Sequence, residues 1–400
     1  MRESPQRLAI VVSHPTQYYS PWFRALAATS EVSIKVFYLW DFGVKPTIDP
    51  RFGREITWDV DLLSGYESTF VRNVAKHPGA ESFFGFRNPD LARALSEWSP
   101  DALLLFGYAW ASHLRALVWA RLHGVPILFR GDSHMIGRSA DRGASSFLKR
   151  LIFAQFAAIT YVGAANRDYF RALGVPESKL SFAPHSVNAE LFREDSPSDR
   201  ARALELRAGL GIPSHAKVIL FAGKLVAAKQ PMELLEAFIG AADPNAALLF
   251  VGDGELKRGL EARARASGLA TIHFLAFANQ SEMPSRYLAA DIFVLPSRGV
   301  YETWGLAVNE AMHCGTPCLV SSHVGCQRDL VSDGLTGWVF EAEDDAGLKA
   351  TMQRALADVR AAQSLAALKA RIRERIAGYT YDKTCEGVLS AFRAVTGRKA

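Results

Sequence analysis

Short apolar runs alternate with amphipathic stretches from one end of the chain to the other. This alternation predicts an α/β fold with mostly parallel sheets, built from repeated strand–helix–strand units. In the first half, the predicted strands are Leu8–Val12, Val32–Tyr38, Ala102–Phe106, Pro126–Phe129, Ala158–Val162 and Ser181–Pro184. The predicted helices are Tyr19–Ala28, Pro89–Trp98, His113–His123, Ser145–Phe156 and Ala165–Leu173.

A polar, charged stretch from Glu194 to about Ala216 separates this series from a second one. Its prolines and glycines favour a linker between two domains. The later predicted strands are Val218–Phe221, Ala247–Val251, Ile272–Leu275, Ile292–Leu295 and Cys318–Ser321. Roughly the last 50 residues, rich in Ala and Arg, are predicted to be helical. The pattern therefore predicts two doubly wound lobes of similar size with a cleft between them.

Composition agrees with a globular chain of two domains. The chain has 400 residues, of which 49% are hydrophobic and 22% charged. No apolar run has the length that spans a bilayer, and the segment before Ser13 is too short for a signal peptide. We therefore expect a cytoplasmic protein. The four cysteines match no zinc pattern, and a net charge of +5 does not single out nucleic acid as a partner.

Two glutamates, Glu302 and Glu310, bracket a Trp-Gly turn directly after the predicted strand Ile292–Leu295. If a helix begins near Trp304, a rise of about 1.5 Å per residue places Glu310 about 9 Å along the helix axis from that turn. Free N–H groups of the first helical turn would form a phosphate site between the two carboxylates. Two glutamates at this spacing also arise by chance. Their position at the carboxyl end of a parallel strand favours a site for an elongated ligand such as a nucleotide sugar.

A second candidate site follows the strand Val218–Phe221. Gly223 permits a close turn, and Lys224 and Lys229 precede a helix that is predicted to start near Pro231. Glycine, cations and a helix start together favour binding of a diphosphate, whose departure needs charge compensation. The alternative is a pair of solvated lysines on a loop. Gly252 lies in a similar but less specific turn, and the backbone near Phe277 is a candidate for contact with a base.

These motifs resemble the donor-binding signature of glycosyltransferase family 4, the glycosyl transferases group 1. The resemblance covers most of residues 217–342. It rests on Glu302 and Glu310 with Gly315-Thr316-Pro317, and on Gly223-Lys224-Leu225 with Lys229. Further matching segments are Val251-Gly252-Asp253-Gly254, Ala290–Ser297 and Asp333–Gly337. The family implies the GT-B fold, two Rossmann-like domains that face each other across a cleft, and transfer with retention of anomeric configuration.

The resemblance implies a division of the chain and of its site. Residues 1–195 would bind the acceptor, 196–216 would be the linker, 217–378 would bind the nucleotide sugar, and 379–400 would be a helix crossing back to the first domain. Glu302 would lie nearest the anomeric centre and Glu310 would hold the ribose. The implied donor-binding residues are Gly223, Lys224, Lys229, Gly252, Phe277, Thr303, Trp304, Gly305, Leu306 and Glu310. Lys224 replaces the family's usual arginine and so removes a bidentate phosphate contact. Thr303 and Trp304 stand where glycine and phenylalanine are commoner.

The first domain is expected to supply the acceptor site. Asp132 and His134 follow the strand Pro126–Phe129, and either could touch the donor sugar or orient the acceptor hydroxyl. The alternative for Asp132 is a helix N-cap. His14 and Gln17 follow the first strand and are further acceptor-site candidates, with a structural histidine as the alternative. Asp132 is placed with Glu302 in the catalytic group, and His14, Gln17 and His134 in the acceptor-binding group.

The segment Asp59-Val60-Asp61 matches the Asp-x-Asp pattern by which other glycosyltransferases hold a divalent metal. Three-residue matches are frequent by chance, and the resemblance implies no essential metal. We therefore expect no cofactor, with the nucleotide diphosphate sugar as donor substrate. No nucleic-acid signature is present, so the expected partners are this donor and a carbohydrate or lipid-linked acceptor.

The predicted function is a retaining hexosyltransferase in glycan, glycolipid or polysaccharide biosynthesis. One alternative is a nucleotide-sugar epimerase or phosphorylase on the same fold, and another is a two-lobed sugar-binding protein without catalysis. The helix Ser145–Phe156 carries Lys149 and Arg150 beside Phe147, Leu151 and Phe153. It could lie on the inner face of the membrane beside a lipid-linked acceptor, or simply pack one face on the sheet.

Overall fold

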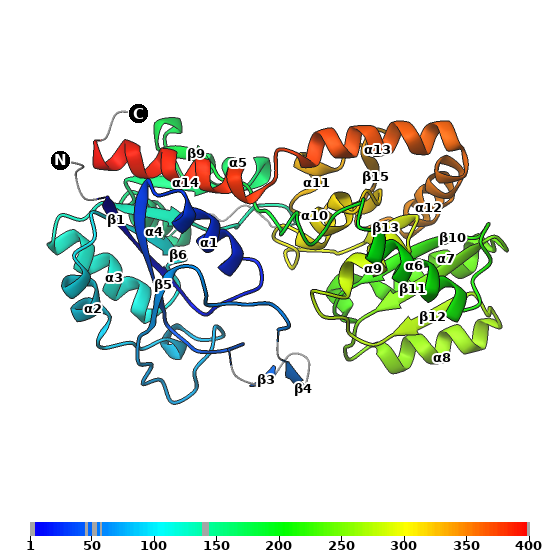
Figure 1. The fold of residues 1–400 in the computed structure, drawn as a ribbon, viewed down its shortest axis with the longest axis horizontal. Coiled ribbons are helices and arrows are strands. Elements are labelled where there is room, and N and C mark those ends of the chain that lie inside the picture. Colours follow the sequence, from blue (N-terminus) through cyan, green and yellow to red (C-terminus); the bar gives the residue numbers. More distant parts are fainter. Residues whose placement is uncertain (1–4, 45–46, 50–53, 57, 138–143, 398–400) are drawn as a thin grey trace.

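The computed structural model describes residues 5–44, 47–49, 54–56, 58–137 and 144–397. Two lobes, each built on a parallel sheet, lie side by side along the long axis of the molecule (Figure 1). The predicted class, two doubly wound lobes facing a cleft, is confirmed. We call them the first and the second lobe.

The described part of the first lobe contains a seven-stranded sheet in which neighbouring strands run parallel. In sheet order its strands are β5 (Glu67–Phe70), β2 (Val32–Tyr38), β1 (Gln6–Val12), β6 (Ala102–Phe106), β7 (Ile127–Arg130), β8 (Ala158–Tyr161) and β9 (Leu180–Phe182). The short strands β3 (Thr47–Asp49) and β4 (Arg54–Ile56) form a separate antiparallel pair. The helices of this lobe are α1 (Ser20–Ala28), η1 (Phe83–Gly85), α2 (Leu91–Trp98), α3 (Ala111–Leu122), α4 (Ala144–Phe153), α5 (Ala164–Ala172) and η2 (Glu177–Lys179).

The second lobe has six strands in the described residues, again all parallel. In sheet order they are β12 (Ile272–Leu275), β11 (Ala246–Val251), β10 (Lys217–Ala222), β13 (Ile292–Leu295), β14 (Cys318–Ser321) and β15 (Gly337–Phe340). Its helices are α6 (Pro197–Gly209), η3 (Ala227–Lys229), α7 (Pro231–Ala241), α8 (Lys257–Ser267), α9 (Met283–Leu288), α10 (Leu306–His313), α11 (Gln327–Leu330), α12 (Asp345–Arg360) and α13 (Ala362–Ile376).

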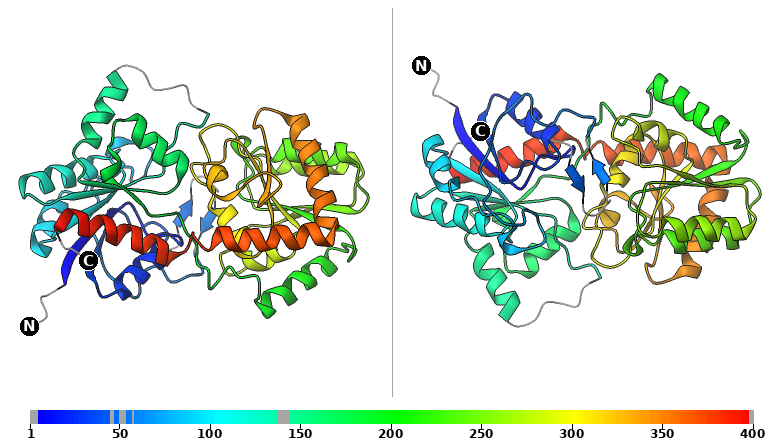
Figure 2. Two further views of the ribbon diagram at one scale, coloured as in Figure 1. Left: turned by 90° about the horizontal axis from the view of Figure 1, so that it is seen from above. Right: turned by 90° about the horizontal axis from the view of Figure 1, so that it is seen from below.

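Helices cover both faces of each sheet, which explains why the central strands are apolar on both sides. In the first lobe, α2 to α5 share one core with the sheet, and α1 shares the other core with α14 (Tyr381–Thr396). In the second lobe, α7, α8 and α12 lie on one face and α9 and α10 on the other. Figure 2 shows α13 and α14 passing in succession from the second lobe to the first, so the chain crosses between the lobes twice.

The structure contains several elements that the sequence pattern did not predict. β5 and β15 extend the two sheets at one edge each, and β3 and β4 form the small hairpin. Helix α6 occupies most of the stretch expected to be a linker and packs against α9. It starts at a Ser-Pro pair, in which Ser196 accepts a hydrogen bond from the amide of Asp199 and Pro197 occupies the first turn.

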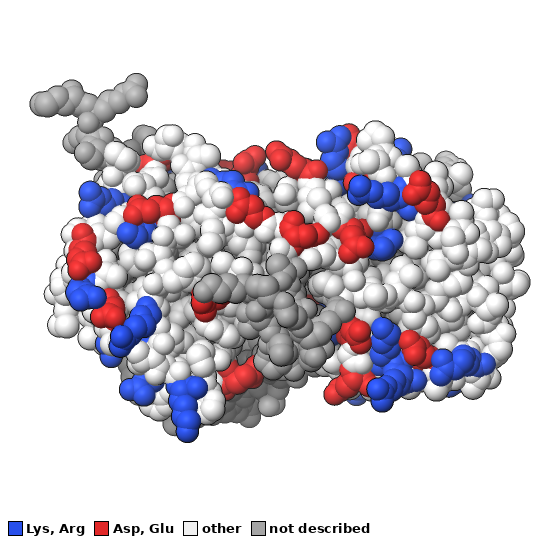
Figure 3. Space-filling model, turned by 60° about the horizontal axis from the view of Figure 1, so that its bottom comes forward, with Lys and Arg blue, Asp and Glu red and all other residues white. Residues whose placement is uncertain are grey.

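Among the described residues, no helix is long and apolar enough to cross a membrane. Acidic and basic side chains are interspersed over the visible face of both lobes (Figure 3). The visible face thus carries no large patch of a single sign.

Candidate functional site

The site lies where the two sheets change strand order. In the first sheet the order reverses between β1 and β6, and in the second between β10 and β13. Loops at the carboxyl ends of parallel strands bind ligands at such switch points. A cavity of about 580 Å³ lies here, lined by residues of both lobes. Those from the second lobe include Gly223, Lys224, Lys229, Gly252, Phe277, Glu302, Thr303, Trp304, Gly305, Leu306 and Glu310, and those from the first include His14, Gln17, Phe42, Trp58, Asp132 and His185.

Two glycines shape the floor of the cavity in the second lobe. Gly223 follows β10 and has φ of +152°, and Gly252 follows β11 with φ of +141°. A Cβ on Gly252 would lie 2.0 Å from the carbonyl oxygen of Gly223, so the two turns can touch only without side chains. This contact brings the loop that carries Lys224 and Lys229 close to the ends of both strands.

Lys229 and Glu302 form the central ion pair of the site. The Nζ of Lys229 lies 2.8 Å from Oε2 of Glu302, which also accepts a hydrogen bond of 3.2 Å from Ser297. The two side chains keep only 14% and 16% exposure, so water screens their attraction less than it would at the surface. The sequence assigned these residues to different ends of the ligand, and the structure brings them into direct contact.

Helix α10 begins at Leu306, and not near Trp304 as the sequence suggested. Gly305 precedes it in the left-handed region, with φ of +100°, so the backbone turns sharply into the helix. Within the first turn the amide of Val308 donates to the carbonyl of Gly305 at 2.8 Å, so the N–H groups that remain for a ligand are those of Leu306 and Ala307. Trp304 is buried, and its indole donates a 2.8 Å hydrogen bond to Asn309. Its side chain thus fixes the turn.

Glu310 lies deep in the cavity and accepts hydrogen bonds from three side chains. The donors are Tyr18 (3.1 Å) from the first lobe, and Gln280 (3.4 Å) and Tyr287 (2.7 Å) from the second. Burial raises the pKa of Glu310, and the hydrogen bonds and the charge of Lys229 only partly offset this rise. The carboxylate is thus held in one orientation.

Asp132 projects from the end of β7 toward the second lobe. Its Oδ2 accepts a 2.8 Å hydrogen bond from Thr303 and lies 3.6 Å from Nε2 of His185. Burial by itself would raise the pKa of Asp132, but hydrogen bonds from His185 and Thr303 and the charge interaction with His185 lower it to about 2. The side chain keeps 39% exposure, so this ionised carboxylate remains accessible from the cavity.

His134 and His14 occupy different positions. His134 is buried, accepts a hydrogen bond from the amide of Ile136 and lies 3.4 Å from the carbonyl oxygen of Glu302. It supports the Glu302 loop and is not among the residues that line the cavity. His14 does line it, as does Gln17, and its ring packs edge-on against Phe42 at 5.4 Å. Of Asp132 and His134, the structure therefore exposes only Asp132 to a ligand in the cavity.

The Asp-x-Asp segment does not gather its carboxylates at one point. Asp61 accepts hydrogen bonds from the amides of Leu63 and Ser64 and pairs with Arg24. Asp59 instead reaches the second lobe, where Ser281 donates to it from both its amide and its hydroxyl. In the part of the chain that the structure describes, no group of three or more His, Cys, Asp or Glu is placed to hold a metal ion.

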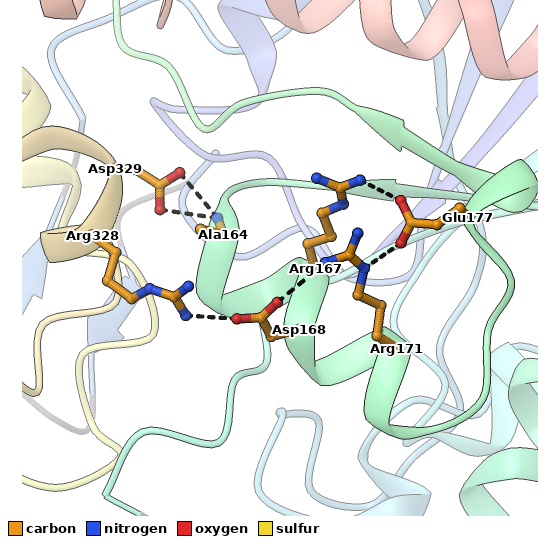
Figure 4. A network of polar contacts seen from close by, with 7 residues as sticks. All are labelled: Ala164, Arg167, Asp168, Arg171, Glu177, Arg328 and Asp329. Atoms are coloured by element: carbon orange, nitrogen blue, oxygen red, sulfur yellow. Dashed lines mark hydrogen bonds and ion pairs between the residues drawn. The ribbon is translucent and has the colours of Figure 1, made fainter.

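The lobes meet at a second contact, between α5 and α11 (Figure 4). Both carboxylate oxygens of Asp329 accept from the amide of Ala164 at 3.0 Å, at the N-terminus of α5, where the helix dipole favours a negative charge. Arg328 pairs with Asp168 at 2.7 Å one turn further along. A Cβ on Gly163 would lie 2.4 Å from the ring of Trp304 and 2.7 Å from Asp329. The two lobes can therefore approach this closely only because residue 163 has no side chain.

Sequence reasoning missed several residues of the site. His185 follows β9, and Tyr18 follows β1 in the loop that carries His14 and Gln17. The sequence signal that could have identified both residues is their position shortly after a predicted strand. Arg130 holds the His185 segment in place, because its guanidinium donates to the carbonyls of Ala183 (2.9 Å) and Pro184 (3.3 Å).

Comparisons with known proteins agree with this geometry. The family described as glycosyl transferases group 1 matches residues 203–375. A D-inositol 3-phosphate glycosyltransferase from Catenulispora acidiphila is 34% identical over 366 residues, which cover 84% of this chain and 82% of that protein. One from Geodermatophilus obscurus is 31% identical over 239 residues, 57% of this chain and 50% of its own length. The solved structure of Anabaena HepE in complex with UDP and glucose has a TM-score of 0.69 and 14% identity, and covers 97% of this chain and 100% of that one.

Proposed function

Because this chain belongs to the glycosyl transferases group 1 family and has the GT-B fold, we propose that it moves a hexose from a nucleoside diphosphate sugar to an acceptor hydroxyl, with retention. The observation that carries the proposal is the Lys229–Glu302 pair at 2.8 Å, beside the first turn of α10 and at the switch point of the second sheet. The product would enter a glycan, glycolipid or polysaccharide.

The cavity offers a separate place for each part of the donor. Lys224, Lys229 and the first-turn amides of α10 would hold the diphosphate. Glu302 would accept hydroxyls of the sugar, and Glu310 hydroxyls of the ribose. The complex of HepE with UDP and glucose supports this class of donor.

Transfer would proceed on one face of the sugar. The bond from the anomeric carbon to the phosphate oxygen breaks, and the acceptor oxygen forms a new bond on the same side. The acceptor proton passes to the departing phosphate oxygen, and the lysines compensate its charge. Asp132, which accepts a hydrogen bond from Thr303 next to Glu302, would position the hydroxyls around the reacting carbon. We propose that no metal or other cofactor is required, so transfer should persist in the presence of a chelator.

The first-lobe wall of the cavity favours an acceptor without a phosphate. Among the described residues that line it, the first lobe supplies hydroxyl, amide, imidazole and aromatic groups with one carboxylate, Asp132, and no Lys or Arg. The acceptor in the names of the relatives, D-inositol 3-phosphate, carries an anionic group that this wall would not neutralise. A neutral carbohydrate hydroxyl, free or linked to a lipid, fits better.

We further propose that α4 brings the first lobe to a membrane that carries a lipid-linked acceptor. Its exposed apolar side chains include Phe147 (64% exposed), Leu148 and Leu151. Lys149 and Arg150 lie between Leu148 and Leu151 in the sequence. No acidic residue lies in the helix, so its charge suits an anionic bilayer surface.

The deciding experiment is release of nucleoside diphosphate from a panel of nucleotide sugars, with and without acceptors. Lys229→Ala and Glu302→Ala are expected to lower turnover about 100- to 1000-fold, the usual cost of losing one charge-stabilising group. Lys217→Ala is the matched control, because Lys217 forms a similar pair with Asp291 (3.2 Å) at the opposite end of β10. Wild-type turnover in Lys229→Ala would refute the phosphate role. Conversion of the donor sugar without acceptor would indicate an epimerase instead, and binding without any release a sugar-binding protein.

A further inference from the structure

Trp58 and Asp59 of the first lobe reach across the cleft to the second lobe. The Trp58 indole faces the ring of Phe277, with centroids 6.4 Å apart and planes inclined by 55°. Next to it, Asp59 accepts hydrogen bonds from the amide and hydroxyl of Ser281, the amide at 3.1 Å. Two neighbouring residues are thus tied to two points of one loop in the opposite lobe.

This contact lies at the nucleotide end of the cavity. Trp58 and Phe277 both line the cavity, as does Gln280, which donates to the proposed ribose anchor Glu310. Phe277 and Ser281 therefore flank the residue that contacts that anchor. With the phosphates near Lys229 and the ribose near Glu310, the part of the donor that remains for this end is its base.

Resting on the proposed function, we propose that Trp58 completes the base site from the first lobe. Two rings inclined by 55° form a corner, in which a flat base can stack on the indole and direct its edge toward Phe277. The indole also packs against Gly43. A Cβ there would lie 3.4 Å from the indole nitrogen, so the ring lies close against that backbone.

The second lobe alone would hold the phosphates and the ribose, and the base would bind fully only when Trp58 is in place. The Asp59–Ser281 hydrogen bonds fix the position of Trp58 relative to Phe277. Every base can stack on an aromatic ring, so Trp58 adds affinity for all nucleosides. Selection of one base over another would depend on groups that contact the edge of the base.

Calorimetric titration with UDP, ADP, GDP and inorganic pyrophosphate tests this role in the full chain. In Trp58→Ala, the Kd of the nucleoside diphosphates is expected to rise about tenfold, as for loss of one base–aromatic stack, and that of pyrophosphate to stay unchanged. Trp58→Phe should recover most of the loss, because it retains a ring. Asp59→Asn should give a smaller rise, because it weakens the tie to Ser281. Trp40→Ala is the control, since Trp40 stacks on Phe42 at 4.5 Å but does not line the cavity.

Three results would overturn the inference: unchanged nucleotide binding in Trp58→Ala, an equal loss for pyrophosphate, or a rise confined to the acceptor KM. The last would place Trp58 in the acceptor site beside Phe42. If the wild-type chain bound none of the nucleotides, the proposed function itself would fail. Should Trp58→Ala not fold, as judged by its thermal unfolding, Asp59→Asn provides the comparison: a rise in the Kd of the nucleoside diphosphates without a rise for pyrophosphate supports the inference, and an unchanged nucleotide Kd overturns it.

Discussion

Burial and hydrogen bonding act on Glu310 in opposite directions. Burial disfavours its charge, whereas Tyr287, Gln280 and Tyr18 stabilise it, and the net result is a raised pKa. A raised carboxyl pKa means that the folded state holds its proton more tightly than the unfolded state does. Its contribution to stability is then greatest in acid and is lost as the pH rises through the folded-state value. Ionisation of Glu310 therefore costs the folded state stability, and the three hydrogen bonds offset only part of this cost.

Glu310→Gln should therefore separate stability from function. At pH 7 its free energy of unfolding is expected to equal or exceed that of wild type, because a neutral amide replaces the buried charge and Tyr287 can turn to accept from it. The difference should shrink as the pH falls toward about 4.3, the ordinary carboxyl pKa. Affinity for nucleoside diphosphates should fall about tenfold or more, as expected when a charged hydrogen-bond acceptor is lost. Urea unfolding and nucleotide titration measure the two effects. A large loss of stability at pH 7 would show that the carboxylate is primarily structural.

At the scale of elements, the contact between α5 and α11 sets how closely the lobes approach. Gly163→Ala would place a methyl group 2.4 Å from Trp304 and force α11 away from α5. We expect a loss of about 1–3 kcal/mol in unfolding free energy, as for other overpacked sites, and slower transfer because Trp304 fixes the turn beside Glu302. Gly209→Ala is the control, because a Cβ at Gly209 would meet no atom within 4 Å. Unchanged turnover in Gly163→Ala would show that this contact does not position the site.

The sequence could predict those elements whose pattern is local. The strands that end in site residues are short apolar runs followed by Gly, Ser or Pro, and all eleven predicted runs form strands in the structure. β5 was missed because three of its four residues, Glu67 to Phe70, are polar and all four are exposed or partly exposed at a sheet edge. The start of α10 was misplaced because the left-handed Gly305, and not Trp304, terminates the loop.

The parts of the site that join the lobes could not be predicted in this way. Tyr18 and Glu310 are hydrogen bonded across 292 positions, and Asp132 and Thr303 across 171. Periodicity places each residue at the end of its own strand but contains no information on how two separate sheets face each other. The residues predicted to bind the donor could be identified from the sequence because they follow strands of one sheet and match a family signature. His185, Trp58 and Ser281 come together only where the two lobes meet.

At the scale of the whole molecule, α4 presents Phe147, Leu148 and Leu151 on the surface of the first lobe. The described segment before it ends at Gly137, where a Cβ would lie 3.2 Å from the backbone of Gly299 in the loop that leads to Glu302. If α4 contacts a bilayer as proposed, a lipid-linked acceptor would have to extend from that surface to the proposed site at Glu302.

Charge substitutions on α4 should test this arrangement. The double variant Phe147→Glu/Leu148→Glu is expected to lose cosedimentation with phosphatidylglycerol vesicles, while its turnover with a water-soluble acceptor stays near that of wild type. Leu204→Glu is the matched control, an equally exposed leucine (69%) on α6 of the second lobe. Retention of the double variant on vesicles would exclude α4 as the contact.

Helix α14 also has a consequence for how the protein is made. The core that β1 begins is completed by Val388, Leu389 and Phe392, which lie near the other end of the chain. At about 5–20 residues per second, a ribosome needs roughly 20–80 seconds to pass from β1 to α14. During that time one face of the first sheet is covered by α1 without α14. The second lobe is translated later, and the helices that cover its sheet lie within its own part of the sequence. The lobe translated first is therefore the last to be completed, and its nascent strands are the segment for which protection by a chaperone matters most.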